Sequence, residues 1–380
     1  MRIAINAWFL DQPGTGSGQY LQGLLRAMAD EAMAHQFLLI SPWEDSEFEL
    51  PELQATQWHF RSRFWQSNLG KVLFEQIAFP WACRRWEADV AHVPYWGSSL
   101  WPMVPTVVTI HDLIPLLLPA YRGGLLVQLY SHLVAVAARR AAAVLTDSLA
   151  SKRDIEEHLG LPPARVRCIY LAVGEQFSPQ PAADDIAIRR RYGLAARYVL
   201  YLAAHDVRKN VAGLVEAFAT VAQADDDVSL VIGGELPKRE KAPLYDPRPL
   251  VSALGIEDVV QFIGWVDEAH KPALYRGAAC AVFASRYEGF GLPVLEALAC
   301  GAPLVASNTS SVPELVGDSG FAVDPDDVRS LAGAILACLV DEQLAAELRR
   351  RGPEQASKFS WTQVARETLA IYREVATCAS

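Results

Sequence analysis

The chain has 380 residues, of which 51% are hydrophobic and 21% are charged, as is typical of a globular protein with sizeable cores. The net charge of −10 argues against nucleic acid as the main partner, although a nucleotide needs only a local positive cleft. The six cysteines form no C-x-x-C pair, so we expect neither a zinc site nor a redox dithiol.

The sequence shows no segment typical of a membrane span. The N-terminus runs directly into a predicted strand, without the architecture of a signal peptide. The most apolar stretch, about 125–145, is interrupted by His132, Arg139 and Arg140. We therefore expect a cytoplasmic protein.

Short β-branched runs alternate with longer helical patterns along the chain. The predicted strands are 3–7, 37–40, 90–92, 107–110, 143–146, 166–169, 198–201, 229–232, 259–263, 281–284, 304–306 and 320–323. This alternation is typical of βαβ units, which form parallel sheets covered by helices. So many strands divide naturally into two sheets of about six.

A polar stretch with two prolines, 175–185, separates the two groups of strands. We therefore predict a first domain over 1–176 and a second over 183–360. The chain ends in a predicted helix, from 361 to about 376, that has one apolar face.

The first loop after a strand, 13–20, contains three glycines that would let the backbone approach a phosphate. It fails as a dinucleotide fingerprint because Gln19 stands where G-x-G-x-x-G needs its third glycine. A purely structural turn explains the loop equally well. We favour a ligand contact through Gly16 and Gly18, ahead of a helix that starts near Tyr20.

The segment 61–86 is both basic and aromatic. Its basic residues are Arg61, Arg63, Lys71, Arg84 and Arg85, its acid is Glu75, and its large aromatics are Phe64, Trp65, Phe74, Phe79, Trp81 and Trp86. Such helices can lie on an anionic membrane surface. A buried amphipathic helix with solvated cations fits the same pattern, so contact with a membrane or a lipid-linked acceptor is a hypothesis.

His111 and Asp112 follow a predicted strand, and ligands of open α/β sheets bind at such carboxyl ends. A polar pair inside an apolar stretch must be hydrogen-bonded or functional. In one reading Asp112 caps the loop and His111 is a buried, hydrogen-bonded histidine. In the other His111 is functional and contacts a ligand at this edge of the sheet.

The loop 205–210 follows the first predicted strand of the second domain and carries Arg208 and Lys209. Asn210 is a predicted N-cap for the next helix. Two cations beside the positive end of a helix are unfavourable unless an anion joins them, and a diphosphate is such an anion. The alternative is a pair of solvated surface cations.

Glu288 and Glu296 lie eight residues apart, with Gly289, Gly291 and Pro293 between them. This order predicts a tight loop entering a helix, with the proline in the first turn. The N–H groups at such a helix end favour an anion. Since carboxylates repel an anion, we interpret them as acceptors for sugar hydroxyls, in a pocket for a sugar attached to a diphosphate.

Other acidic residues are interpreted as structural. Ser311 and Glu314 fit an S-x-x-E capping box at the start of a helix. The acidic runs 225–227 and 324–327 lie at predicted turns, where we expect turn and cap residues instead of a metal site.

Residues 288–296 resemble the E-x7-E signature of retaining glycosyltransferases with the GT-B fold, in particular glycosyltransferase family 4. The resemblance covers nearly the whole chain and is strongest to bacterial mannosyltransferase-like members. It implies an α/β fold with two Rossmann-like domains facing each other across a deep cleft. The N-terminal domain (1–176, joined by the C-terminal helix 361–380) would bind the acceptor, and the C-terminal domain (183–360) the nucleotide-sugar donor.

The resemblance also implies residue roles. Residues assigned to catalysis are Glu288, Lys209, Arg208 and His111. Residues assigned to donor binding are Gly16, Gly18, Val266, Gly289, Phe290, Gly291, Leu292 and Glu296. Within these sets the cations hold the diphosphate, Glu288 and His111 contact the donor sugar, Glu296 binds the ribose, and main-chain groups at Val266 read the base. The basic loop departs from the family at 203–204, where two alanines replace glycine or arginine.

The implied activity is retaining transfer of a hexosyl group to a saccharide or lipid-linked saccharide in polysaccharide biosynthesis. GDP-mannose is the first expected donor and a UDP-hexose the next, with no metal or other cofactor and possible peripheral contact with the inner membrane face. The alternatives are a GT-B sugar-nucleotide epimerase or phosphorylase, a non-catalytic sugar-nucleotide binding protein, and an NAD-dependent oxidoreductase built on the loop 14–18.

Overall fold

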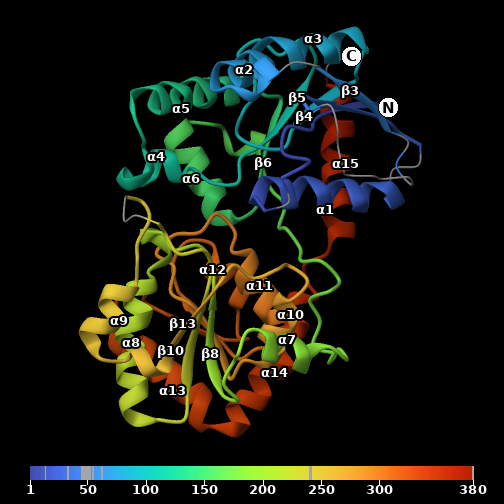
Figure 1. Ribbon diagram of the computed structural model, residues 1–380. Helices are drawn as coiled ribbons and strands as arrows, with labels where there is room; N and C mark the ends of the chain where they lie inside the picture. The colour runs from blue at the N-terminus through green and yellow to red at the C-terminus, as the bar shows by residue number, and fades with distance from the viewer. Residues whose placement is uncertain are drawn as a thin grey trace. The chain divides into compact units, whose positions relative to one another are not determined.

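The computed structural model describes residues 1–12, 14–31, 34–43, 53, 55–60, 63–238 and 242–378. The chain forms two compact units, Met1–Leu171 with Ser360–Ser380 and Ala172–Phe359 (Figure 1). Residues 172–176, assigned to the first domain from the sequence, lie in the second unit.

The first unit is built on a parallel sheet of seven described strands in the order β3-β2-β1-β4-β5-β6-β7. Their bounds are Arg2–Asn6 (β1), Gln36–Ser41 (β2), Ala55–His59 (β3), Val90–Val93 (β4), Thr106–Thr109 (β5), Ala143–Thr146 (β6) and Val166–Cys168 (β7). The sequence did not predict β3, because this edge strand is partly exposed and lacks a β-branched run.

Helices cover this sheet. They are α1 (Gly16–Glu31), α2 (Asn68–Leu73), a π-helical turn (Phe74–Ala78), α3 (Phe79–Arg85), α4 (Ile114–Leu117), α5 (Leu125–Ala138), α6 (Leu149–Leu159) and α15 (Trp361–Thr377), with short 3₁₀ turns at Arg63–Gln66, Pro119–Tyr121 and Pro163–Arg165. The apolar stretch near 125–145 therefore contains the helix α5, which ends at Ala138, and the start of the strand β6. Among the described helices, none is long and apolar enough to cross a bilayer.

The C-terminal helix α15 packs on α1 of the first unit. A Cβ atom on Gly23 would lie 2.3 Å from the Trp361 indole, so the helices meet where a side chain is missing. Arg366 pairs with Glu31 at 2.8 Å. These contacts make the last segment of the chain part of the first unit.

The second unit has a parallel sheet of six described strands in the order β10-β9-β8-β11-β12-β13. The strands are β8 (Tyr198–Leu202), β9 (Ser229–Gly233), β10 (Val260–Gly264), β11 (Cys280–Phe283), β12 (Leu304–Ser307) and β13 (Phe321–Val323). The helices are α7 (Asp185–Arg191), α8 (Val211–Ala224), α9 (Arg248–Leu254), α10 (Lys271–Gly277), α11 (Leu292–Ala299), α12 (Val312–Val316), α13 (Val328–Val340) and α14 (Glu342–Ala356), with 3₁₀ turns at Val207–Lys209 and Glu257–Val259.

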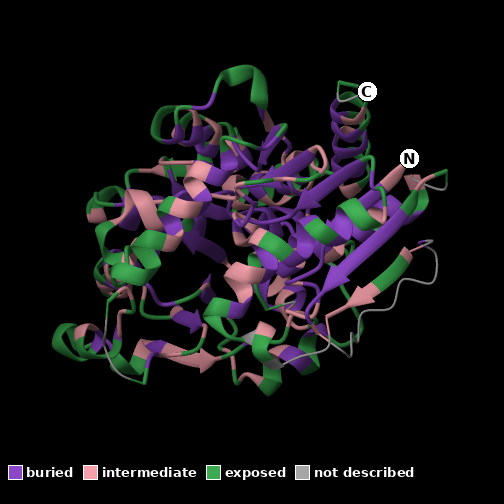
Figure 2. Cartoon of the chain, turned by 90° about the horizontal axis from the view of Figure 1, so that it is seen from above, coloured by how far each residue is buried: buried purple, intermediate pink, exposed green. Residues whose placement is uncertain are grey.

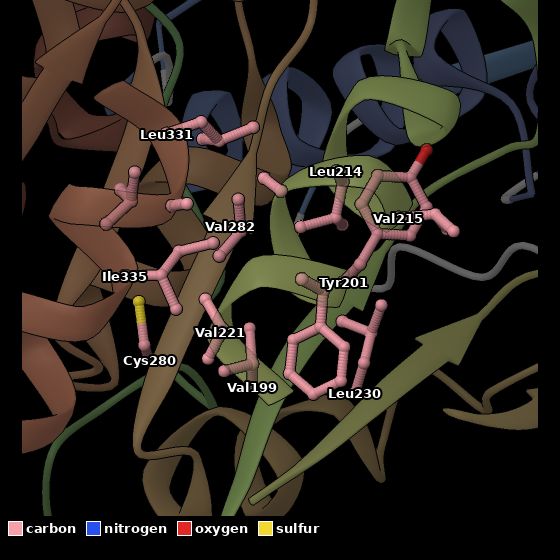
Figure 3. Packing of buried hydrophobic residues seen from close by; sticks show 14 of the residues in the cluster. Val199, Tyr201, Leu214, Val215, Val221, Leu230, Cys280, Val282, Leu331 and Ile335 are labelled. Atoms are coloured by element: carbon pink, nitrogen blue, oxygen red, sulfur yellow. The ribbon is translucent and has the colours of Figure 1, made fainter. Parts of the chain in front are cut away.

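Buried apolar residues of this second sheet pack against its helices. Val199 and Val282 on neighbouring strands share one core with Leu214 of α8 and Leu331 of α13 (Figure 3). Buried residues are concentrated on strands, whereas exposed residues follow the outer faces of helices (Figure 2). The predicted parallel, helix-covered sheets are therefore confirmed.

In both sheets the strand order reverses beside the first strand of the unit. The reversal lies between β1 and β4 in the first sheet and between β8 and β11 in the second. Loops leaving two such strands diverge to opposite faces of the sheet, and the crevice between them is the usual ligand site of this architecture. The loop after β8 carries Arg208 and Lys209 and the loop after β11 carries Glu288, which are three of the residues predicted from the sequence to be catalytic.

Candidate functional site

A buried ion-pair cluster joins these two loops. The Glu288 carboxylate lies 2.5 Å from Lys209 Nζ and 2.7 Å from a guanidinium nitrogen of Arg208. The same guanidinium donates to the Tyr287 carbonyl at 3.1 Å. Each of the three charged side chains is more than four-fifths buried. The structure therefore brings together three of the four residues predicted to be catalytic.

Two caps hold the cations between β8 and α8. Asp206 accepts a hydrogen bond from the Arg208 N–H at 3.2 Å and starts the one-turn helix that carries Arg208 and Lys209. Asn210 has a left-handed backbone (φ 53°) and caps α8 by accepting from the Gly213 N–H, as predicted. Asparagine tolerates this conformation better than most residues. The caps at Asp206 and Asn210 thus fix the backbone that carries Arg208 and Lys209.

The charge balance of the cluster differs from the sequence interpretation. Burial alone would raise the pKa of Glu288, but Lys209 and Arg208 lower it to about 2. A second carboxylate, Asp206, lies 3.6 Å from Arg208 Nε. Two cations therefore face two carboxylates, and an incoming diphosphate would compete with Glu288 for them. The sequence interpretation had given the cations and Glu288 separate partners.

Hydroxyl groups from the loop after β12 hold the Glu288 loop. Ser310 Oγ donates to the Glu288 carbonyl at 2.5 Å, and Ser311 Oγ lies 3.0 Å from the same carbonyl and 2.7 Å from that of Phe290. Because the Ser311 hydroxyl points to these carbonyls, it does not cap α12. Ser311 stands at the N-cap of α12 and Glu314 lies in its first turn, as predicted, but the Ser311 side chain does not make the hydrogen bond to the helix that a capping box requires. The hydroxyl-rich run 308–311 was the available signal for this support.

The loop after β11 enters α11 as predicted. The helix begins at Leu292, with Pro293 in its first turn. Gly291 has φ 107°, a conformation that side-chain-bearing residues rarely adopt, so glycine is needed there. Phe290 is buried. Contact of the backbone of Gly289–Leu292 with a diphosphate stays a prediction.

Glu296 is buried on α11 and already has protein partners. Tyr275 donates to its carboxylate at 3.1 Å, and the Lys271 ammonium lies 3.7 Å away while also pairing with Glu268. Burial raises the pKa of Glu296, against the opposing effect of Lys271. Sequence reasoning missed both partners because they lie on α10, about twenty residues earlier in the chain. The ribose role of Glu296 stays a prediction.

The predicted base-recognition loop follows β10. Val266 is buried, whereas the neighbouring Trp265 is exposed. Because the apolar Val266 side chain is buried, only its main-chain groups are suited to read a base. Base recognition at Val266 stays a prediction. Nearby, His205 is buried beside Gly234, and burial lowers the pKa of His205. His205 is a further buried polar residue in the loop after β8. The sequence analysis gave it no role.

His111 belongs to the first unit and is held in place by its surroundings. Its Nδ1 lies 2.6 Å from Asp147 Oδ2, and the Tyr20 ring packs edge-on at 5.0 Å. Burial alone would lower the pKa of His111, but the Asp147 carboxylate outweighs it and raises the pKa. Asp112 accepts from the Ile114 N–H, as the structural reading expected. His111 is therefore a hydrogen-bonded histidine, as the structural reading expected. Its contact with a sugar stays a prediction.

The glycine-rich segment is mainly helical. The helix α1 begins at Gly16 and not near Tyr20, so the prediction of its start is wrong. A Cβ atom on Gly18 would lie 2.0 Å from the Gln12 carbonyl oxygen, which excludes any larger residue. Gly16 meets no such obstacle. Tight packing therefore explains Gly18, while a ligand contact of either glycine stays untested.

The acidic runs occupy turns and caps, as predicted. Asp225 follows α8 and pairs with Arg197 at 2.6 Å. Asp327 caps α13 by accepting from the Ser330 N–H. Within the part of the chain that the structure describes, no group of three or more His, Cys, Asp or Glu residues is arranged to hold a metal ion.

The basic and aromatic segment 61–86 separates into buried and exposed parts. Phe74 and Phe79 are buried in the core, whereas Phe64 and Trp81 are exposed. Residues 61–62 and the side chain of residue 63 lie outside the described part. The single acid, Glu75, is buried and accepts from Tyr130, and burial raises its pKa to about 7. The buried-helix reading thus holds for part of the segment, and membrane contact stays untested.

Comparison with known proteins gives a consistent result along the whole chain. Residues 14–176 match the family model Glycosyltransferase Family 4, and residues 186–355 match the model Glycosyl transferases group 1. The O-antigen chain mannosyltransferase B of Escherichia coli is 30% identical over 394 residues, covering 98% of this chain and 100% of that protein. The mannosylfructose-phosphate synthase of Agrobacterium fabrum is 32% identical over 202 residues, 52% of this chain and 44% of that protein.

Solved structures share the fold. Sucrose-phosphate synthase from Thermosynechococcus elongatus has a TM-score of 0.77 at 22% identity and covers 100% of both chains. Anabaena HepE, solved in complex with UDP and glucose, has a TM-score of 0.73 at 19% identity, covering 97% of this chain and 98% of that one. These likenesses confirm the GT-B class, with two parallel-sheet Rossmann-like domains.

Proposed function

Because this chain is a glycosyltransferase of family 4 with the GT-B fold, we propose that it transfers a hexosyl group, with retention of configuration, from a nucleotide-diphosphate sugar to a saccharide. The observation that carries this proposal is the buried cluster of Arg208, Lys209 and Glu288 at the strand-order reversal of the second unit.

In the proposed reaction the two cations stabilise the leaving diphosphate. As the bond between the anomeric carbon and the diphosphate oxygen breaks, negative charge grows on that oxygen, and Arg208 and Lys209 meet it in a site that is already ordered. Preorganised charges of this kind supply the largest part of many rate enhancements. Glu288 supports both cations and accepts hydrogen bonds from the donor sugar.

The acceptor hydroxyl attacks the same face that the diphosphate leaves, and its proton passes to the departing diphosphate oxygen. No residue of the chain is assigned as a covalent nucleophile in this proposal. His111 contacts the donor sugar, and Asp147 keeps its ring oriented at 2.6 Å. Glu296 and the main chain at Val266 bind the nucleoside.

Mannose from GDP-mannose is the first proposed donor, supported by the mannosyltransferase among the relatives. A UDP-hexose is the second, supported by the UDP and glucose held in the HepE structure. The proposed acceptor is a growing polysaccharide or its lipid-linked precursor. Peripheral membrane contact through 61–86, with Trp81 and Phe64 exposed, would bring the protein to such an acceptor.

We propose further that transfer needs no metal ion, since Arg208 and Lys209 supply the positive charge that the diphosphate requires. Treatment with EDTA should leave the rate within about twofold of its initial value. Recovery of a lost rate by added Mg²⁺ or Mn²⁺ would contradict this.

A calorimetric panel of GDP, UDP, ADP and their sugar conjugates tests the donor. Mass spectrometry then tests the reaction, because transfer yields a heavier acceptor and a free nucleoside diphosphate. An epimerase would return a sugar nucleotide of unchanged mass, and a phosphorylase would consume or release phosphate. A binding protein would turn over no donor, and an oxidoreductase would bind NADH.

A further inference from the structure

A lysine surrounded by aromatic rings lies where the strand order of the first sheet reverses, between β1 and β4. Lys71 belongs to α2, and its ammonium lies 5.9 and 5.4 Å from the ring centroids of Trp8 and Phe9, which follow β1. The rings of Tyr95, which follows β4, and Tyr130, on α5, lie 5.3 and 5.4 Å away. Loops that leave two strands at such a reversal frame the usual ligand crevice of this architecture. None of these five residues is assigned to donor binding.

Lys71 has a single charged partner in the part of the chain that the structure describes, the Glu75 carboxylate at 3.7 Å. That distance is longer than a hydrogen bond, and an ammonium carries three N–H donors. The carboxylate is already occupied, because the Tyr130 hydroxyl lies 3.0 and 2.9 Å from its two oxygens. The Lys71 side chain is 27% exposed whereas that of Glu75 is fully buried. The ammonium therefore has donors left for a ligand, and the carboxylate does not face one.

The backbone around Glu75 holds this arrangement in place. Glu75 lies on the π-helical turn that follows α2, and such turns are frequent at functional sites. The side chain of the next residue, Gln76, accepts from the Leu100 N–H at 3.0 Å, which fixes the loop after β4. A Cβ atom on Gly97, in the same loop, would lie 2.7 Å from a Glu75 carboxylate oxygen, so a larger residue is excluded there. Contacts from the π-helical turn and from this loop therefore fix the carboxylate next to Lys71.

The groups around Lys71 suit a saccharide that carries a negative charge. Burial raises the pKa of Glu75 to about 7, against the opposing effects of Lys71 and the two tyrosine hydroxyls, so near neutral pH the carboxylate neutralises the lysine only in part. A largely buried ammonium without a full counter-charge favours an anion. The rings of Phe9 and Tyr130 are partly exposed, and ring faces can pack on the apolar C–H face of a sugar, which an inorganic anion lacks.

We propose that Lys71 binds the carboxylate or phosphate group of an anionic saccharide, with the rings of Phe9 and Tyr130 against the sugar, and that this saccharide is the acceptor. Lys71 is then a specificity-determining residue, because a neutral saccharide leaves its ammonium without a counter-ion. The identification of the ligand as the acceptor rests on the proposed function. Binding at Lys71 itself requires neither a donor nor transfer.

The first test is calorimetric titration of the full chain without donor. The parent protein carries Lys209→Ala, so that the cation cluster of the second unit contributes less to anion binding. The ligands are glucuronate, galacturonate and mannose 6-phosphate, each beside its neutral parent hexose. We expect the anionic ligands to bind on the order of tenfold more tightly than the neutral ones, and Lys71→Met to abolish the difference. The matched control is Lys152→Met, because Lys152 forms the same i,i+4 pair, with Glu156 at 3.8 Å, and is 28% exposed on α6.

The pH dependence of binding gives a readout that lost packing would not move. Ionisation of Glu75 above about pH 7 neutralises Lys71, so the affinity for a hexuronate should fall by up to about tenfold from about pH 6 to about pH 8. The carboxylate of the ligand stays ionised over this range. The other titratable groups that face Glu75 are Lys71, Tyr95 and Tyr130, and burial raises the pKa of both tyrosines, which stay protonated. In Glu75→Gln the affinity should be nearly independent of pH, whereas the control Glu156→Gln should follow the parent.

Transfer by the chain with its native Lys209 then tests whether the ligand is the acceptor. Charged saccharides should be the better acceptors, and Lys71→Met should raise their KM on the order of tenfold while the donor KM stays unchanged. A chain that binds anionic saccharides through Lys71 but transfers no hexose would refute the proposed function and leave the binding site standing. An active chain that prefers neutral acceptors would refute the assignment to the acceptor.

Three results of the titrations would overturn the binding site itself. In the first, anionic and neutral ligands bind equally well. In the second, Lys71→Met and Lys152→Met lose the same affinity, or a folded Lys71→Met binds like the parent, with folding checked by a thermal melt. In the third, the affinity of the parent for a hexuronate does not change with pH, a result that holds even where Lys71→Met fails to fold.

Discussion

Replacing Glu288 by glutamine gives the sharpest prediction about the ion-pair cluster. The two side chains have nearly the same shape, so the change removes charge with little loss of packing. In the folded protein the pKa of Glu288 is lowered from 4.5 to about 2, chiefly by Lys209 and Arg208 acting against burial. At neutral pH that difference corresponds to about 3 kcal/mol of stability that the neutral amide cannot supply.

The expected loss in Glu288→Gln is therefore on the order of 2–3 kcal/mol, or roughly 4–10 °C in melting temperature for a unit of this size. The lowered pKa of Glu288 also sets the direction in which the stability difference between wild type and variant changes with pH. The contribution of Glu288 is complete above pH 4.5 and disappears as pH falls toward 2, so the difference between variant and wild type should shrink in acid.

The same variant separates the role of Glu288 from that of the cations. Without the Glu288 carboxylate, Arg208 and Lys209 lose one competitor for a diphosphate, although Arg208 keeps Asp206 and the Tyr287 carbonyl as partners. GDP or pyrophosphate should therefore stabilise the variant more than the wild type. Transfer should nevertheless fall about 100-fold, because the contact with the donor sugar is lost. The control is Glu216→Gln, an equal change of charge on the exposed face of α8.

Thermal melts with and without GDP, followed by steady-state kinetics, check these expectations. Equal melting temperatures for variant and wild type at neutral pH would refute the electrostatic account of the cluster. A variant that is unstable but not rescued by any diphosphate would refute the idea that the cations are a diphosphate site.

Three further predictions concern other residues assigned to the reaction or its supporting contacts. Lys209→Ala should lower kcat about 100-fold or more while the chain stays folded, as kinetics and circular dichroism would show. Ser311→Ala removes the hydroxyl that contacts two carbonyls of the Glu288 loop, so we expect about 1–3 kcal/mol lower stability in urea unfolding and a raised donor KM. Asp147→Asn should lower the pKa of His111, because the carboxylate that raises it is gone; NMR titration of the ring measures this, and an unchanged pKa would contradict it.

Patterns that depend on local chemistry could be predicted from the sequence. Alternating strands and helices gave the two parallel sheets, and the Asn210 cap and Pro293 turn follow from the preferences of single residues. The edge strand β3 escaped prediction because an edge strand pairs through its backbone and needs no continuous apolar run.

The parts that could not be predicted depend on tertiary contacts. Ser311 has the sequence context of a helix cap, but its hydroxyl bonds carbonyls of a loop some twenty residues earlier. The partners of Glu296, Tyr275 and Lys271, likewise lie on another helix. Sequence reasoning placed Glu288 beside the cations without showing that they neutralise one another, because a direct ion pair depends on side-chain positions.

The central claim is that the Arg208–Lys209–Glu288 cluster performs sugar transfer from a nucleotide-diphosphate donor. The most direct measurement is mass spectrometry of a saccharide acceptor incubated with the chain and a panel led by GDP-mannose, in parallel with Glu288→Gln and Glu216→Gln. We predict an acceptor heavier by one hexose unit, with equimolar nucleoside diphosphate, for the wild type and Glu216→Gln but nearly none for Glu288→Gln. Equal product from all three proteins would contradict the account.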